Sequence, residues 1–321
     1  MTQTNAHIVS STSGSESKAV AANATNLKLV TNTENNNDII IEAWNTVLFD
    51  KYLRFKHLFT EGLALHSEQV LQRQGYQPGM KILDVGCGFG DSTIDIAKVV
   101  GAQGKAVGID CAANFVEASR HDAAEAGATN ATFFVADASI DDLGGPYDGA
   151  FARFGTMFFN LPGAAMINVR SSLKPGGKFT QVVWRKRQEN PWLHDAELCV
   201  KEIVPVVSHD ETDAVHCGPG PFSMAGPDMV SEMLKVTGYE RISFERFDCD
   251  ISIGRDIDEA IQFAMTYGPA GEIIRLAEQE GQRQIPEVMA ALHDVFAKYI
   301  REDGSVWAPS SAWIISAYNP Q

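Results

Sequence analysis

The sequence predicts an α/β fold built on a doubly wound, mostly parallel sheet, and three observations carry that prediction. Short apolar segments alternate with helical ones between residues 81 and 184. The first apolar segment runs into a glycine-rich turn, KILDVGCGFG, at Lys81–Gly90. A further apolar segment, SAWIISAY at Ser311–Tyr318, reads as a last strand. With 321 residues, 45% of them hydrophobic, the chain can bury a full core.

The glycine-rich turn predicts a cradle for a nucleotide-like cofactor. Residues 82–85 read as a buried strand, and Gly86, Gly88 and Gly90 follow at alternate positions. The next segment, DSTIDIAKVV, reads as a helix that Asp91 or Ser92 could cap. Bare backbone beside a helix N-terminus can approach a ligand closely and donate hydrogen bonds to it.

The spacing of the glycines decides between cofactors. A dinucleotide fingerprint needs glycine or alanine at position 91, where this chain has Asp91, and a P-loop needs a Gly-Lys-Ser/Thr sequence that is missing here. Asp84, two residues before the first glycine, would repel a pyrophosphate. The same acid suits a ligand that carries an ammonium or sulfonium group.

At this point the chain resembles the class I S-adenosylmethionine (SAM) dependent methyltransferases, whose first motif is an apolar strand followed by D-x-G-x-G-x-G. Asp84 and the three glycines fit that motif, with Cys87 between the first two glycines. The resemblance covers residues 81–184 and implies a Rossmann-like, seven-stranded sheet whose last strand is antiparallel. Within the superfamily it is nearest to the small-molecule group that includes the ubiquinone and menaquinone biosynthesis methyltransferases.

The strands that follow continue the resemblance. KAVGID (Lys105–Asp110) ends in an acid placed to accept hydrogen bonds from both ribose hydroxyls, and Phe115 matches the family's adenine-packing position. ATFFVAD ends at Asp137, where the family binds the adenine amino group, and Arg153 could hold the methionine carboxylate. The residues expected to contact SAM are Asp84, Gly86, Cys87, Gly88, Gly90, Asp110, Cys111, Phe115, Asp137, Ala138 and Arg153.

The amino-acid composition and net charge argue against some classes of binding partner. A net charge of −15 and a sequence pI near 4.9 argue against a nucleic-acid or anionic-lipid surface, and no apolar run is long enough to span a bilayer. Five dispersed cysteines without metal-ligand spacing indicate a reducing compartment and no metal site. We therefore expect a cytoplasmic enzyme with a small-molecule acceptor, and leave homo-oligomerisation open.

The remaining chain is expected to form a cap on the cofactor domain. Residues 39–59 carry aromatic residues at helical spacing, which indicates either a helix pair packed on the sheet or a lid over the site. The segment divisions predicted from the sequence are a disordered tail (1–37), an N-terminal helical lid (38–75), the SAM-binding core (76–188), a cap insertion (189–237), a core strand (238–254), a helical cap insertion (255–302) and the final core strand (303–321).

The acceptor side of the site is predicted less directly. Methyl transfer by in-line displacement needs orientation and exclusion of water, and some acceptors also need a general base. His194, just beyond the fifth strand, is the favoured base, with His66, His216 and Asp195 as alternatives. The candidate acceptor-contacting residues are Trp44, Trp184 and Trp192.

Three other functions compete with this interpretation. The same fold could serve a catalytically silent SAM-binding or scaffold protein, or an aminopropyltransferase that uses decarboxylated SAM. An RNA methyltransferase is disfavoured because the chain is acidic.

Overall fold

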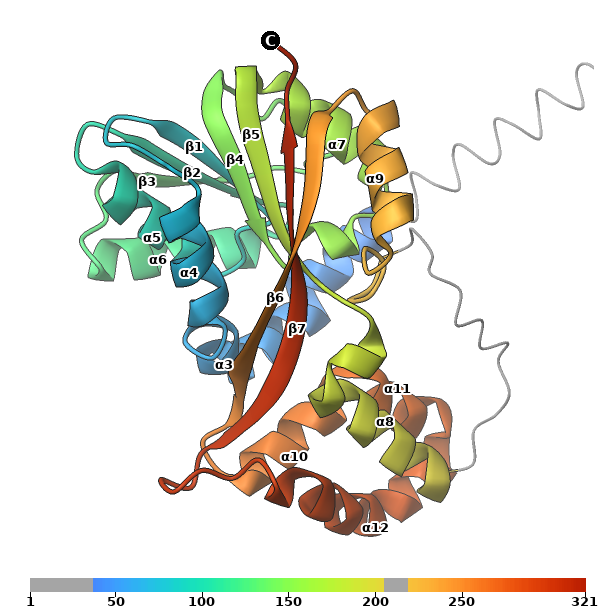
Figure 1. Cartoon of the computed structure of the whole chain (residues 1–321). Helices are drawn as coiled ribbons and strands as arrows, with labels where there is room; N and C mark the ends of the chain where they lie inside the picture. The colour runs from blue at the N-terminus through green and yellow to red at the C-terminus, as the bar shows by residue number, and fades with distance from the viewer. Residues whose placement is uncertain (1–36, 205–218) are drawn as a thin grey trace, which may run out of the picture.

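The computed structural model describes residues 37–204 and 219–321, and these form a seven-stranded sheet with helices on both faces (Figure 1). The predicted tail at 1–37, apart from Asn37, and the candidate base His216 lie outside the described residues. The strands are β1 (Lys81–Val85), β2 (Lys105–Asp110), β3 (Ala131–Val135), β4 (Tyr147–Arg153), β5 (Leu173–Trp184), β6 (Glu240–Gly254) and β7 (Val306–Tyr318).

The order of the strands confirms the predicted fold. The sheet runs β3-β2-β1-β4-β5-β7-β6, and β1 to β5 pair in parallel. The last strand, β7, lies antiparallel to both β5 and β6. The chain order reverses between β1 and β4, so the carboxyl ends of β1, β2 and β4 open onto one crevice.

Along the sheet the chain runs from β1 through β2 to β3 in one direction and from β4 to β5 in the other. Right-handed crossovers in opposite directions place their helices on opposite faces. Helices α5 (Asp91–Val100) and α6 (Ala113–Glu125), with α4 (Ala64–Arg73) beside α5, cover one face, and α7 (Pro162–Ser171) with α9 (Pro227–Val236) covers the other (Figure 1). Residues 37–43 are also helical. The further helices are the π-helix η1 (Trp44–Leu48), α2 (Phe49–Arg54), α3 (Lys56–Thr60), α4 (Ala64–Arg73), α5 (Asp91–Val100), α6 (Ala113–Glu125), η2 (Thr156–Phe158), α7 (Pro162–Ser171), η3 (Arg187–Glu189), α8 (Pro191–Ile203), α9 (Pro227–Val236), α10 (Ile257–Thr266), α11 (Gly268–Leu276) and α12 (Glu278–Ala297).

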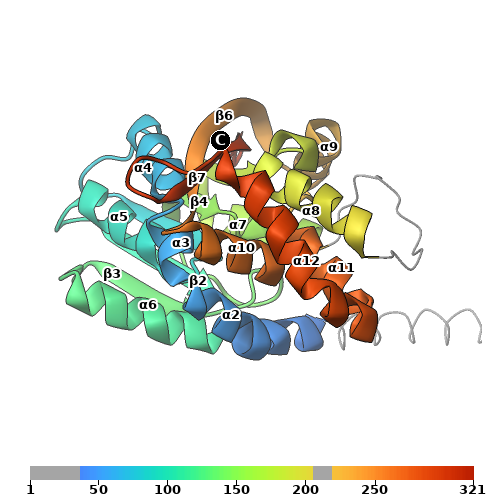
Figure 2. The same cartoon turned by 90° about the horizontal axis from the view of Figure 1, so that it is seen from below.

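The cap helices are connected to the sheet through its two longest strands, β6 and β7. β7 pairs with β5 only over Ala312–Tyr318 but with β6 along its whole length, so 306–311 and 248–254 continue as a two-stranded ribbon beyond the sheet. Helices α10, α11 and α12 leave the end of this ribbon and pack with α8 (Figure 1). Figure 2 shows the N-terminal helices crossing between α6 and this group.

Two of the predicted cap segments are divided in the structure. The cap insertion predicted at 189–237 contributes α8 to the cap, whereas α9 packs beside α7 and β6 on the sheet. The lid predicted at 38–75 likewise ends before α4, whose Val70 and Leu71 are buried in the core beneath it. Both helices have an apolar face, and the sequence alone does not show which surface that face covers.

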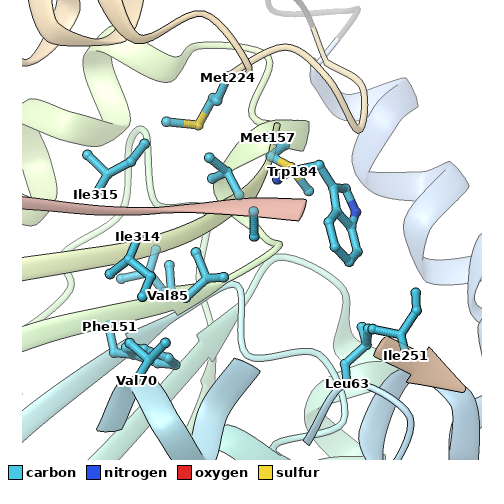
Figure 3. Packing of buried hydrophobic residues seen from close by; sticks show 14 of the residues in the cluster. Leu63, Val70, Val85, Phe151, Met157, Trp184, Met224, Ile251, Ile314 and Ile315 are labelled. Atoms are coloured by element: carbon cyan, nitrogen blue, oxygen red, sulfur yellow. The ribbon is translucent and has the colours of Figure 1, made fainter. Parts of the chain in front are cut away.

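The main core lies between the sheet and its covering helices, where Phe151, Val85 and Ile314 are buried (Figure 3). Trp184, at the end of β5, projects from this core toward Leu63 and Ile251 (Figure 3). Within 37–204 and 219–321, no helix has the length and apolar character needed to cross a bilayer.

Candidate functional site

The glycine turn after β1 has the backbone that the sequence predicts. Gly86, Gly88 and Gly90 have φ values of 68°, 53° and 80°, in the region that favours glycine. A Cβ atom at Gly86 would lie 3.2 Å from the Cα atom of Gly155. Gly86 and Gly88 line a large cavity, whereas Gly90 faces the packed interior. The missing side chain at Gly88 therefore leaves open space for a ligand, whereas those at Gly86 and Gly90 leave room for the Gly155 backbone and for neighbouring side chains.

Asp84 does not reach the cavity, which corrects its predicted contact with SAM. The side chain is buried, and its Oδ2 atom accepts hydrogen bonds from the hydroxyls of Ser92 and Thr93 over 2.7 and 2.6 Å. Both donors lie in the first turn of α5. Asp84 therefore holds the start of α5 against the end of β1. It supports the glycine turn from the buried side, away from the cavity.

This burial gives Asp84 a testable pH dependence. Burial raises the pKa of Asp84 from 3.8 to about 6. The folded state thus favours the protonated carboxyl group of Asp84. This contribution to the free energy of unfolding is fully present below pH 3.8 and is lost as the pH rises through 6. Asp84→Asn keeps an oxygen acceptor and avoids the charge, so in the ligand-free protein we expect it to raise the free energy of unfolding by about 2 kcal/mol at pH 8 and by little near pH 4. Urea unfolding at the two pH values checks this, and an equal difference at both would contradict it.

Asp110 ends β2 at the cavity, as the sequence predicts. Its Oδ2 atom accepts from the Gly88 N–H and its Oδ1 atom from the Ala112 N–H, each over 3.0 Å. Burial raises the pKa of Asp110, and these backbone N–H groups oppose that rise. One carboxylate thus joins the glycine turn to the start of α6, and each oxygen keeps a lone pair for a further donor.

Asp137 follows β3 and also lines the cavity, with Ala138 beside it. Its Oδ1 atom accepts from the backbone N–H and the hydroxyl of Ser139, over 2.8 and 2.6 Å. Its Oδ2 atom accepts from the side-chain amide of Asn37 over 2.6 Å. Asn37 was not predicted as a site residue, because nothing local in the sequence relates positions 37 and 137.

Phe115 is the centre of an aromatic cluster at the same end of the cavity. The ring is buried, and its centroid lies 5.0 Å from that of Phe49, 4.9 Å from that of Phe89 and 6.4 Å from that of Trp44. Phe89 belongs to the glycine turn, whereas Phe49 and Trp44 come from the N-terminal helices. Phe115, the residue predicted to pack on adenine, therefore also contacts the N-terminal helices.

The two cysteines within the cofactor motifs are small, protonated wall residues. Cys87 and Cys111 both line the cavity. Burial, helped by the charge of Asp110, raises the pKa of each thiol above its ordinary value. Neither thiol is therefore poised as a nucleophile.

Arg153 lines the cavity but already has partners. Its Nη2 atom lies 2.6 Å from the Asp91 carboxylate and donates to the Phe59 carbonyl over 3.1 Å, while its Nη1 atom donates to the Ser67 hydroxyl over 2.7 Å. Only 8% of the side chain is exposed. The sequence predicted a carboxylate-binding arginine, and the structure adds that Asp91, at the start of α5, shares the same guanidinium.

These residues surround one end of a cavity of about 1730 Å³. The other end is lined by the cap, with Phe263, Tyr267, Ile274 and Ile285 from α10 to α12 and their connections. Trp44, Trp184 and Trp192 all line it as well. Trp184 stacks on Phe154 with ring centroids 3.9 Å apart, and Trp192 stacks on Phe263 at 5.8 Å.

Of the histidines singled out from the sequence, His66 and His194 lie among the described residues, and neither lines this cavity. His194 lies on α8 outside the lining, and its Nδ1 atom is buried with no hydrogen-bond partner among the described residues. His66 is buried against Phe154 and Trp184, and burial lowers its pKa to about 3, so it is neutral. Asp195 is paired with Lys298 over 2.9 Å. The structure therefore does not support His194 as the base.

Several residues that line the cavity were not predicted individually from the sequence. Tyr52 and Tyr267 face each other edge-on with ring centroids 4.9 Å apart, and burial raises the pKa of each phenol far above 10. Lys186, just beyond β5, is exposed at the cavity. Tyr52 belongs to the aromatic pattern of the predicted lid, but the pattern does not show which of its rings face the site.

Comparison with known proteins agrees with this geometry. Residues 76–213 match the family model of a methyltransferase domain. The chain is 31% identical to a 23S rRNA (uracil(1939)-C(5))-methyltransferase of Xylella fastidiosa over 39% of this chain and 27% of that protein. It is 27% identical to a demethylmenaquinone methyltransferase of Lactococcus lactis over 54% of this chain and 69% of that protein. The YcgJ protein of Bacillus subtilis superposes with a TM-score of 0.50 at 16% identity, covering 80% of this chain and 99% of that one.

The strand order and the matched domain at residues 76–213 resemble those of the class I SAM-dependent methyltransferases. Within that class the chain resembles the methyltransferases of quinone biosynthesis. The chain spans about a quarter of the length of the rRNA methyltransferase, so that similarity concerns the shared domain.

Proposed function

We propose that the protein transfers a methyl group from SAM to a small, largely apolar acceptor by in-line displacement. The observation that carries the proposal is one cavity that is lined both by residues of the cofactor motifs and by aromatic residues of the cap. Ligand pockets commonly measure about 300–1000 Å³, so about 1730 Å³ has room for a cofactor and an acceptor together.

The residues present fit the cofactor. At Gly88 the bare backbone leaves room for a close approach, and Asp110 can accept from ribose hydroxyls. Phe115 and Asp137 would hold the adenine, while Arg153 and Asp91 would face the carboxylate and ammonium of the methionine part. When bound, SAM supplies a methyl group activated by a positively charged sulfur.

The cap supplies orientation and exclusion of water. We propose that Trp184, Trp192 and Trp44 contact the acceptor and that the segments around 37–60, α8 and α10 to α12 enclose it. An enclosed apolar site strengthens the hold on one reactive geometry and keeps water from competing as a nucleophile. Among the described lining residues there is no histidine, so His216 is the histidine candidate that the structure leaves to test.

The test offers the purified protein methyl-labelled SAM with one acceptor at a time. A short-chain demethylmenaquinol represents apolar ring acceptors, and a 23S rRNA fragment represents RNA. We expect label in the quinol product and none in the RNA. Label in the RNA would replace the small-molecule assignment. Tight binding of S-adenosylhomocysteine (SAH) without turnover of the quinol, of a sterol or of a metabolite extract would favour the silent SAM-binding protein.

A further inference from the structure

The N-terminal helices form a strap over the cofactor end of the cavity. We define the strap as residues 37–54, which include η1 and α2. The residues of the strap that line the cavity are Asn37, Ile40, Ile41, Ala43, Trp44, Leu48, Lys51 and Tyr52. No residue between 44 and 54 is fully buried, and 61% of Val47 is exposed. A segment with so little buried surface depends on a few specific contacts to stay in place.

One of these contacts completes a helix that belongs to the cofactor site. Helix α6 begins at Ala113, and its N-cap residue, Ala112, has no side chain that could accept a hydrogen bond. The Oδ1 atom of Asn45 accepts from the backbone N–H of Asn114 over 2.9 Å. That N–H, at the second helical position, is one that an N-cap side chain normally satisfies. Asn45 therefore caps α6 from a position 69 residues earlier in the chain.

The contact is reciprocal and lies between two cofactor residues. The side-chain amide of Asn114 donates to the backbone carbonyl of Asn45 over 2.7 Å. Just before α6, Asp110 accepts from the N–H of Ala112 over 3.0 Å, and Phe115 follows Asn114 directly. The start of α6 is thus held by the proposed ribose acceptor on one side and by the strap on the other.

We propose that Asn45 is a positioning residue that couples the closed strap to cofactor binding by capping α6. Asn45 does not line the cavity, so it acts through Asn114 and the start of α6. This inference rests on the proposed function, since it takes SAM or SAH as the ligand beneath the strap. A bound cofactor orders Asp110 and Phe115, which steadies the helix end that the strap caps. By linkage, the closed strap strengthens cofactor binding by the same free energy, and such a gain in affinity appears mostly as slower release.

The experiment measures release of labelled SAH from the full chain after addition of excess unlabelled SAH. We expect Asn45→Ala to speed release about tenfold, since the lost N-cap hydrogen bond destabilises the start of α6 and the strap would also open more often. Asn45→Asp keeps an oxygen acceptor for the Asn114 N–H and should retain slow release. Asn114→Ala loses only the second hydrogen bond and should show a smaller increase.

The matched control is Asn130→Ala. Asn130 also closes a helix end through its side chain, donating to the carbonyls of Ala97 and Gly101 at the end of α5, each over 2.9 Å. It lies outside the cavity lining. We expect this variant to lose stability without faster SAH release. Hydrogen exchange of residues 37–54 should slow on SAH binding in the wild type and much less in Asn45→Ala.

The outcomes separate this inference from the proposed function. If the wild type binds SAH but Asn45→Ala releases it at the wild-type rate, or only as much faster as Asn130→Ala does, the coupling is wrong and the proposed function stands. If the wild type does not bind SAH at all, both fail. If Asn45→Ala does not fold, comparing Asn114→Ala with Asn45→Asp decides the point, and equal release rates in those two would overturn it.

Discussion

Gly90→Ala is expected to lower the free energy of unfolding by about 4 kcal/mol and to abolish SAM binding. At φ 80° any side chain is strained, and here the added Cβ would also lie 2.6 Å from the Ser119 Cβ atom and 2.7 Å from a ring carbon of Phe133. Both neighbours are buried, in α6 and β3 respectively. To relieve the clash, the glycine turn would have to move away from α6 and β3 and so leave the geometry that cradles the cofactor.

Gly88→Ala separates the clash from the backbone strain. It lies in the same turn at φ 53°, but a Cβ atom there meets nothing within 4 Å. We expect a loss of about 1 kcal/mol, from the unfavourable backbone region alone. Urea unfolding of both variants and of the wild type gives the comparison. Similar losses for the two variants would mean that packing behind Gly90 does not constrain the turn.

Asp110→Ala should weaken SAH binding by about a hundredfold, roughly 3 kcal/mol. The substitution removes the acceptor for the ribose hydroxyls and also leaves the N–H groups of Gly88 and Ala112 without their carboxylate. Asp110→Asn keeps one oxygen acceptor and should lose less. Calorimetric titration with SAH and with NAD measures the effect.

Asp148→Ala is the matched control for this change. The Asp148 carboxylate also accepts from a backbone N–H, that of Lys81, over 2.8 Å, and it pairs with Lys174 outside the cavity. It should lower stability and leave SAH affinity unchanged. Unchanged affinity in Asp110→Ala, or tight NAD binding by the wild type, would refute the cofactor assignment.

Features set by neighbouring residues were predictable from the sequence. Ile82, Leu83 and Val85 are apolar because this strand lies inside a parallel sheet, and the glycines that follow are needed where φ is positive. The acid Asp110 ends its strand at the cavity for the same local reason, since the carboxyl ends of parallel strands meet at one edge. The fold and the order of the cofactor motifs could therefore be predicted.

Features that depend on contacts between distant segments were decided only by the tertiary structure. Asp84 is turned inward by the hydroxyls of Ser92 and Thr93, so an acid in a binding motif serves the core. His194 follows β5 as expected, but the packing of α8 keeps it out of the cavity lining.

The strap shows the same dependence most clearly. Nothing near Asn45 in the sequence indicates that its side chain caps α6, because the partner, Asn114, lies 69 residues away and the two meet only when the N-terminal helices cross the sheet edge. Strands and tight turns are governed by local backbone preferences and by the alternation of apolar residues. The pairing of polar side chains across the molecule depends on where whole helices dock, and that is determined by burial summed over many residues.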